Sequence, residues 1–158
     1  MIVPLFLAVD FMNFTYKTNP CAANVPVAVV MRQGNFSYFD AKMGTGFDLH
    51  VRSIREGSLR TGTRQAVVVV TCDFPIGGTA AAYLFDERKG GAVLLAKVAG
   101  ADWGGDWGQG PSSIHLRFAK HLLYVDQCAD TGCTKTTATT YAMRGGRLAK
   151  VAVRPPGR

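Results

Sequence analysis

Apolar and polar positions alternate along several stretches of the chain with the two-residue period of β-strands. In Phe47–Arg52 every second residue is apolar, as in a strand with one face in water. Ala66–Val70 is apolar at every position, which predicts a strand buried on both faces, with Cys72 in the interior just after it. No window shows the three- and four-residue spacing of a helix, so the pattern indicates sheets.

Three pairs of apolar segments enclose polar turns and predict β-hairpins. The turn Gly145-Gly146 favours type I′ geometry, because glycine readily accepts positive φ. The pairs are Tyr83–Phe85 with Val93–Leu95 around a loop at 86–91, Ile114–Phe118 with Leu122–Val125 around a turn at Ala119 and Lys120, and Tyr141–Met143 with Leu148–Val153 around Arg144–Arg147.

About ten short strands without a linker predict one all-β domain at residues 9–153. We expect an antiparallel meander that forms a sandwich or a barrel with disulfides, in preference to a propeller-like meander. Residues 1–8 are apolar and no basic residue precedes Lys17, so they are either the remnant of a signal peptide or a first strand. The tail at 154–158 is expected to be disordered.

The composition is that of a globular protein. Of the 158 residues 47 % are apolar and 18 % are charged, which excludes the disordered, collagen-like and coiled-coil classes. No apolar run reaches the roughly 18 residues that a membrane-spanning helix needs. The 18 Lys and Arg outnumber the 11 Asp and Glu and give a net charge of +7.

Four cysteines, an even number in a small domain, predict two disulfides and a secreted or periplasmic protein. Turn-forming residues between Cys128 and Cys133 favour a local bridge, which leaves Cys21 for Cys72, although four cysteines allow three pairings. A zinc site is disfavoured, because neither Cys21 nor Cys72 has a second ligand nearby. We therefore expect no metal and no other cofactor.

The segment 101–111 holds both tryptophans of the chain among glycines and is the first candidate binding site. Exposed indole faces stack on sugars or aromatic ligands, and carboxylates accept hydrogen bonds from ligand hydroxyls. The alternative is a glycine-rich crossover whose indoles cover one end of the core. The candidate ligand-binding residues are Asp102, Trp103, Asp106, Trp107 and Gln109.

Basic residues are unevenly distributed and form the second candidate site. Arg52, Arg55, Arg60 and Arg64 cluster around one connection, and six Lys and Arg but no acid follow Asp130. Such a field attracts anionic polymers, so an acidic envelope polymer or a carbohydrate is the candidate partner, and a basic surface that is merely solvated is the alternative. Nucleic acid is disfavoured, because no nucleic-acid-binding motif is present and disulfides are rare in the cytosol.

The order Val9–Tyr16, Asn19–Cys21 and Gly57–Val68 resembles small exported bacterial proteins of uncharacterised function. Their pattern is a Tyr-x-x-x-Pro-Cys start followed by a Gly-Asp-Leu-x-Gly-Asp-Gly-x-Glu-Ala-Val-Val module. Ser58, Thr63 and Gln65 stand here where that module has acids, so a calcium site is not expected. The resemblance implies export and a bridge between Cys21 and Cys72, and it implies no activity.

Taken together, these features favour an exported, non-enzymatic β-domain that binds a ligand or partner through segment 101–111 and the basic surface. A hydrolase is the first alternative, and it requires at least two of Asp102, Asp106, His50, His115 and His121 to meet in a cleft. A structural or inhibitory module is the second alternative.

Overall fold

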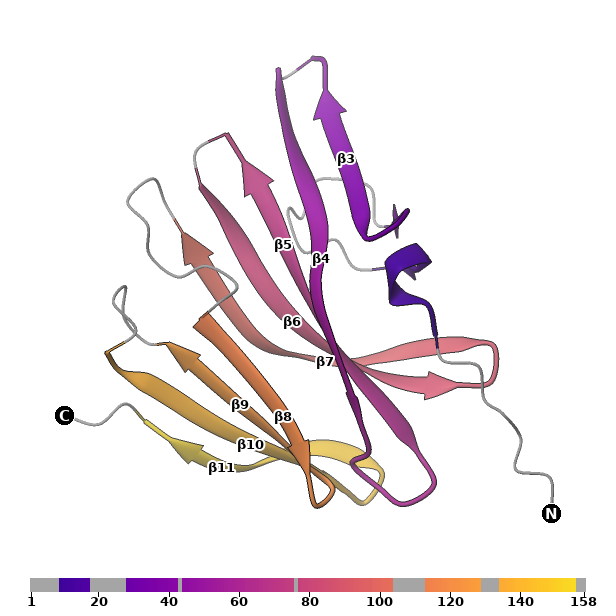
Figure 1. Cartoon of the computed structure of the whole chain (residues 1–158), viewed down its shortest axis with the longest axis vertical. Coiled ribbons are helices and arrows are strands. Elements are labelled where there is room, and N and C mark those ends of the chain that lie inside the picture. The colour runs from indigo at the N-terminus through magenta and orange to yellow at the C-terminus, as the bar shows by residue number, and fades with distance from the viewer. Residues whose placement is uncertain are drawn as a thin grey trace.

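The computed structural model describes residues 9–17, 28–42, 44–75, 77–103, 113–128 and 134–155, and of 101–103 the backbone alone. Within these ranges the chain forms eleven antiparallel strands and one short 3₁₀ helix (Figure 1). The elements are η1 (Phe11–Asn13), β1 (Thr15–Tyr16), β2 (Val29–Val30), β3 (Asn35–Asp40), β4 (Thr45–Gly57), β5 (Arg64–Phe74), β6 (Gly77–Arg88), β7 (Gly91–Trp103), β8 (Ile114–Ala119), β9 (Leu122–Cys128), β10 (Thr136–Arg144) and β11 (Arg147–Arg154).

The strands form three sheets, and the two larger ones are meanders. Strands β3 to β7 follow one another in a five-stranded sheet, β8 to β11 do the same in a four-stranded sheet, and β1 pairs with β2. The all-β, antiparallel prediction is confirmed. The barrel alternative is wrong, because neither meander joins its first strand to its last. The central strands are also longer than expected, with 13 residues in β4 and 11 in β5.

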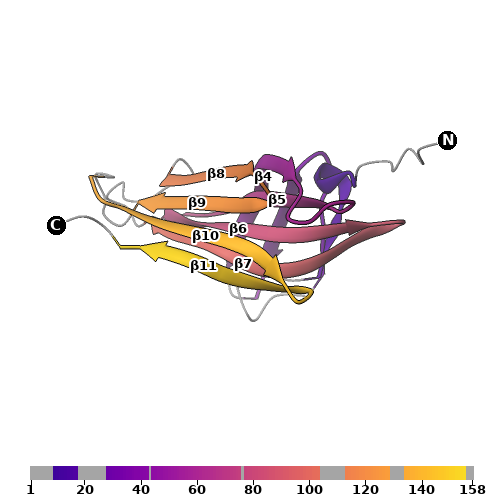
Figure 2. The same ribbon diagram turned by 90° about the horizontal axis from the view of Figure 1, so that it is seen from below.

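The five-stranded sheet is the middle layer of the described structure. Its strand β5 is buried over Gln65–Cys72, as the apolar run Ala66–Val70 predicted. Val68 and Val70 pack with η1, β1 and β2 on one face, whereas Val67 and Val69 pack with β8, β9 and β10 on the other. Two cores therefore lie on opposite sides of one strand. Figure 2 shows the four-stranded sheet lying across one end of the central sheet.

Hydrogen bonds reinforce the contact between the two large sheets. The side chain of Gln127 on β9 donates to the Gly100 carbonyl of β7 and accepts from the Gly100 amide at 3.3 Å. The Tyr141 hydroxyl of β10 donates to the Val98 carbonyl at 3.2 Å. Because both side chains bond to backbone groups of β7, they fix the position of the second sheet on the first.

Tight turns connect most neighbouring strands. Gly145 and Gly146 have φ of +56° and +77°, so the type I′ prediction is confirmed. The turn between β8 and β9 consists of Lys120 and His121, one residue later than predicted, and both have positive φ. The loop expected at 86–91 is only Lys89-Gly90, because Arg88 pairs directly with Gly91.

Cys72 and Cys128 are buried and disulfide-bonded, and no cysteine of the described ranges is free. The pairing itself stays a prediction, because Cys21 and Cys133 lie outside the described residues. Residues 1–8 lie outside them as well. Of the expected tail, Arg154 ends β11, Pro155 is described and 156–158 are not.

Candidate ligand-binding pocket

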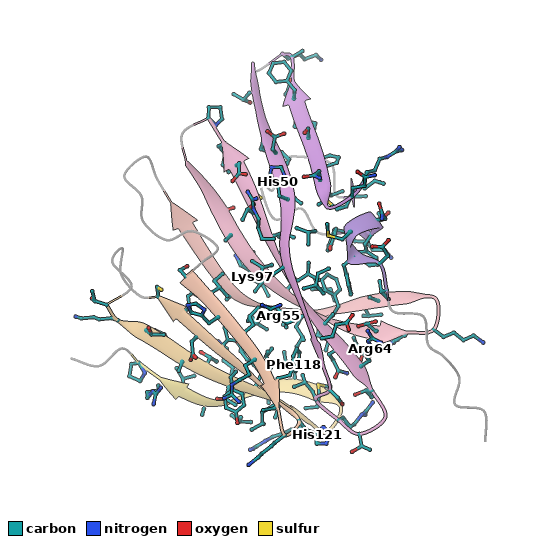
Figure 3. All side chains as sticks on the ribbon, in the orientation of Figure 1. His50, Arg55, Arg64, Lys97, Phe118 and His121 are labelled. Atoms are coloured by element: carbon teal, nitrogen blue, oxygen red, sulfur yellow. The ribbon has the colours of Figure 1, made fainter. Side chains whose placement is uncertain are left out.

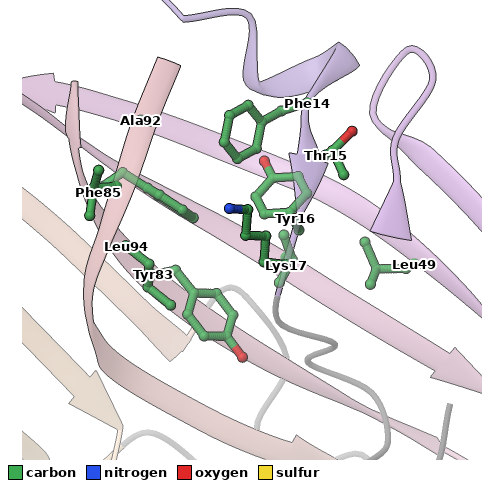
Figure 4. Close-up of a pocket in the computed structure, with 11 residues that line it drawn as sticks. Phe14, Thr15, Tyr16, Lys17, Leu49, Tyr83, Phe85, Ala92 and Leu94 are labelled. Carbon is green, nitrogen blue, oxygen red and sulfur yellow. The ribbon is translucent and has the colours of Figure 1, made fainter. Parts of the chain in front are cut away.

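A pocket of about 280 Å³ lies on the face of the central sheet that packs against the N-terminal segment (Figure 4). The lining is mostly apolar and aromatic and comes from five strands and the two residues that flank β1. It consists of Phe14–Lys17, Leu49, Val70, Tyr83, Phe85 and Ala92–Leu94. The size and the apolar lining are those of small-molecule sites, at the lower end of their range.

Aromatic rings form the firmest wall of the pocket. The Phe14 ring lies 5.3 Å from Phe11, 5.1 Å from Tyr16 and 5.8 Å from Phe85, measured between centroids. The Phe85 ring is 5.2 Å from Phe11 and 5.8 Å from Tyr16. Tilted and edge-on pairs at these distances are the favoured aromatic geometry, so the wall is already formed without a ligand.

Three polar contacts hold the N-terminal segment in place over the sheet. The Tyr16 hydroxyl donates to the Phe11 carbonyl at 2.9 Å, and the Met31 amide donates to the Phe14 carbonyl at 3.1 Å. The Val9 amide donates to the Glu87 carboxylate on β6 at 3.2 Å. The segment therefore forms a fixed roof for the pocket.

The opposite wall depends on a distortion of β7. The pairing of β7 with β6 shifts register twice, between Ala82 and Tyr83 and between Leu84 and Phe85. Such bulges bend and twist a strand, and Figure 1 shows the end of the β6–β7 hairpin turning away from the rest of the sheet. Ala92–Leu94 on this bent end line the pocket, and Val93 and Leu94 are 43 % and 37 % exposed.

Two lining residues bring polar groups to the pocket. Burial raises the pKa of Tyr83, and its hydroxyl makes no hydrogen bond to any other residue that the structure describes. The Lys17 ammonium is exposed and has no ion pair among the described side chains. No carboxylate, histidine or cysteine is among the described lining residues. Lys17 and Tyr83 therefore offer this apolar pocket two hydrogen-bond donors that can orient a ligand.

The sequence located the β6–β7 hairpin but not the pocket. The alternation of Phe14 and Tyr16 in a short apolar stretch was the available signal. The rest depends on how the N-terminal segment packs over the bulged β6–β7 hairpin, and bulges have no sequence pattern of their own.

The predicted segment 101–111 is described only in part. The backbones of Asp102 and Trp103 belong to β7 and pair with Thr79 and Gly78. Their side chains, and the whole of Asp106, Trp107 and Gln109, lie outside the described residues. The carbohydrate-binding role of this segment stays a prediction.

The predicted arginine cluster spans β4, the following turn and the start of β5. Arg52 bonds to Asp73 at 3.1 Å and to the Thr71 hydroxyl at 2.9 Å, and Arg64 contacts Glu56 and, at 3.2 Å, Glu87. Arg55 and Arg60 make no ion pair within the described ranges. Half of this cluster is therefore neutralised by neighbouring carboxylates.

The three histidines do not gather in one place. His50 lies on the polar face of β4, where its Nδ1 is 2.6 Å from Asn35 Oδ1 and its Nε2 is 3.4 Å from Asp73 Oδ2. Figure 3 shows His121 at the other end of the molecule from His50. His115 is an exposed residue of β8. Among the described residues no group of three potential metal ligands is present, and no described helix is long and apolar enough to cross a membrane.

No family model matches the chain, and neither a curated protein nor a solved structure shows significant similarity to it.

Proposed function

We propose that this protein is an exported, non-enzymatic binding domain that holds a small apolar group in the pocket between β1 and β4–β7. The observation that carries the proposal is the lining itself, which combines a preformed aromatic wall with an ammonium and a hydroxyl that no other described residue binds. A described lining without a carboxylate, histidine or cysteine favours binding over hydrolysis.

The volume limits the bound group. One water molecule occupies about 30 Å³ of the liquid. If each non-hydrogen atom of a ligand takes the same volume, the pocket of 280 Å³ holds about nine of them. That is a single aromatic ring with a short substituent, or a short acyl chain. At about 0.3 kcal/mol per atom, nine atoms contribute about 3 kcal/mol, which corresponds to a dissociation constant on the order of several millimolar. A tighter ligand must also use the polar groups at the pocket.

Lys17 selects the charge of the ligand. It is the cationic residue of the described lining, which holds no acid to neutralise it. A carboxylate attached to the apolar group would gain a charge-assisted hydrogen bond from the ammonium, and Tyr83 would supply a second donor. The proposed ligand class is therefore a small aromatic or short-chain carboxylate.

The test is binding of 3-phenylpropionate and of its neutral amide, measured by ligand-observed NMR. We expect saturable binding of both, with the carboxylate tighter by about 10- to 150-fold, the value of a hydrogen bond to a charged group. A92F places a ring in the pocket and should abolish binding of both probes. K17Q should lower the affinity for the carboxylate to that of the amide.

The matched control is A152F, which adds the same ring at an exposed position of β11. It should bind both probes as the wild type does. Wild-type binding of neither probe, or unchanged binding by a folded A92F variant, would contradict the proposal. Circular dichroism establishes that each variant is folded.

The disulfide state of Cys72 and Cys128 supports an oxidising location. Peptide mapping of the unreduced protein, purified from its own host, should give the pairs Cys21 with Cys72 and Cys128 with Cys133. Free thiols at all four positions would overturn export, whereas another pairing would overturn only the predicted connectivity.

A further inference from the structure

The positive charge of the protein is concentrated on the four-stranded sheet. The described residues 113–128 and 134–155 contain seven Lys and Arg but only one acid, Asp126. The other described ranges hold ten Lys and Arg and eight Asp and Glu, and there Arg52, Arg64 and Arg88 are paired with carboxylates. The second sheet therefore carries a charge that its own residues do not balance.

Four arginines lie on the outer face of this sheet, which we call the arginine face: Arg117, Arg144, Arg147 and Arg154. Ile114, Leu116 and Phe118 of β8 turn inward, so Arg117 points outward. Tyr141 and Met143 of β10 also turn inward, which places Arg144 outside. Arg147 pairs with Arg144, and Arg154 pairs with the outward position Ala138. All four side chains are exposed.

The pair Arg144 and Arg147 independently favours an anionic partner. The two residues stand directly opposite each other next to the Gly145-Gly146 turn. Like charges in this position destabilise a hairpin. No ion pair to any described acid relieves the repulsion. An anionic group bound between the two guanidinium groups would do so.

The residues around these arginines disfavour two classes of anionic partner, nucleic acids and lipid bilayers. The Arg117 guanidinium lies 4.2 Å from the centre of the Tyr124 ring and so covers a face on which a nucleic-acid base would stack. None of the exposed large apolar residues that the structure describes points outward from the arginine face. Val153 is the exposed apolar residue of this sheet, and it pairs with Thr139, whose side chain faces inward. A bilayer-bound surface would be expected to insert such residues.

We propose that the arginine face binds an acidic polysaccharide through its carboxylates. Guanidinium groups pair with carboxylates in a bidentate geometry. Along β10, the six residue-to-residue steps from Ala138 to Arg144 extend about 20 Å at roughly 3.4 Å per step, so the face spans several sugar units. This site is separate from the pocket and does not depend on the proposed function.

The experiment measures binding of polygalacturonate to the full chain at several salt concentrations. The variant R144Q/R147Q/R154Q removes three charges from the face. The control R32Q/K42Q/K89Q removes three charges from exposed positions elsewhere, so the net charge changes equally. We expect the face variant to bind roughly 100-fold more weakly, from the contribution that each Lys or Arg makes at an anionic surface. The control should lose less than about 5-fold, since distant charges are screened.

Two further probes test the class of partner. Single-stranded oligothymidylate and vesicles with anionic lipid should each bind more weakly than polygalacturonate. The proposal is overturned if the wild type does not bind polygalacturonate at low salt, if the two variants lose affinity equally, or if the oligonucleotide or the vesicles bind more tightly. Because the substituted residues are exposed, both variants should remain folded.

Discussion

Gly57, the last residue of β4, provides a direct test of how the two large sheets pack. A Cβ built on this glycine would overlap the Cβ and Cγ of Phe118 on β8. Its φ is not in the left-handed region, so glycine is needed here for space rather than for backbone conformation. The atoms in the way belong to the rigid base of the Phe118 side chain, which cannot swing aside. Substitution of Gly57 by Ala should therefore force the sheets apart.

The expected magnitudes follow from this overlap. Overpacking of this kind costs about 1–3 kcal/mol, which for a chain of this length lowers Tm by roughly 2–12 °C. Phe118→Ala alone should cost about 3 kcal/mol, the lower end for this substitution, because Phe118 is only partly buried. In the double variant the methyl group introduced by Gly57→Ala occupies space that the ring has left. The cost of the double variant should therefore be about 1–2 kcal/mol less than the sum of the two single costs.

Urea denaturation followed by far-ultraviolet circular dichroism measures all four proteins of this cycle. A shift of the midpoint at constant m-value shows that stability alone has changed. Additivity within about 0.5 kcal/mol would refute the packing of β4 against β8, since that is the behaviour of residues that do not touch. A neutral Gly57→Ala variant would refute it as well.

Three further predictions concern single residues. The side chain of Gln65 is 2 % exposed, accepts a hydrogen bond from the Leu59 amide at 2.7 Å and donates one to Asp86 at 2.8 Å. Gln65→Leu should therefore lower the free energy of unfolding, measured in urea, by about 1–3 kcal/mol. An unchanged midpoint would contradict this. Burial, helped by the nearby charge of Asp10, raises the pKa of Tyr16, and burial also raises the pKa of Tyr83 and Tyr141. Above about pH 10 the tyrosine hydroxyls lose their protons in the unfolded chain and keep them in the native chain. The free energy of unfolding should therefore fall by up to about 1.4 kcal/mol per pH unit for each tyrosine. A constant free energy of unfolding from pH 9 to 11 would refute this. Arg147→Glu should replace a like-charge pair with an opposite one and raise stability by about 0.2–1 kcal/mol while polygalacturonate binding falls; lower stability would show that Arg144 and Arg147 do not repel each other.

The sequence predicted the elements well where one residue type dominates a segment. Ala66–Val70 is uniformly apolar, and its strand is buried on both faces. Gly145-Gly146 accepts the positive φ that the observed type I′ turn requires at both positions. The alternation in Phe47–Val51 also gave the correct faces, with Phe47 and Leu49 buried and Asp48 exposed. In each case the local pattern and the tertiary environment agree.

Features that depend on contacts between distant segments were not predictable. Lys120 and His121 have positive φ, which is uncommon for residues other than glycine, because the register of β8 and β9 leaves only these two for the turn. The neutralisation of Arg52 and Arg64 depends on Asp73 and Glu87, which lie on other strands. The sequence also revealed the acid-free C-terminal end, but the common outer face of its arginines required the strand register.

The pocket and the arginine face lie on opposite sides of β5, and this arrangement predicts that they act independently. Communication between two sites requires an element with two arrangements that both ligands can bias. The residues of β5 between the sites, Ala66–Val70, are at most 2 % exposed and are paired with β4 and β6 throughout, so this strand has no second arrangement at hand. Saturating polygalacturonate should therefore change the affinity for 3-phenylpropionate less than about twofold. A change of about fivefold or more, the lower limit of typical allosteric coupling, would show that the middle layer moves as the outer sheet binds its partner.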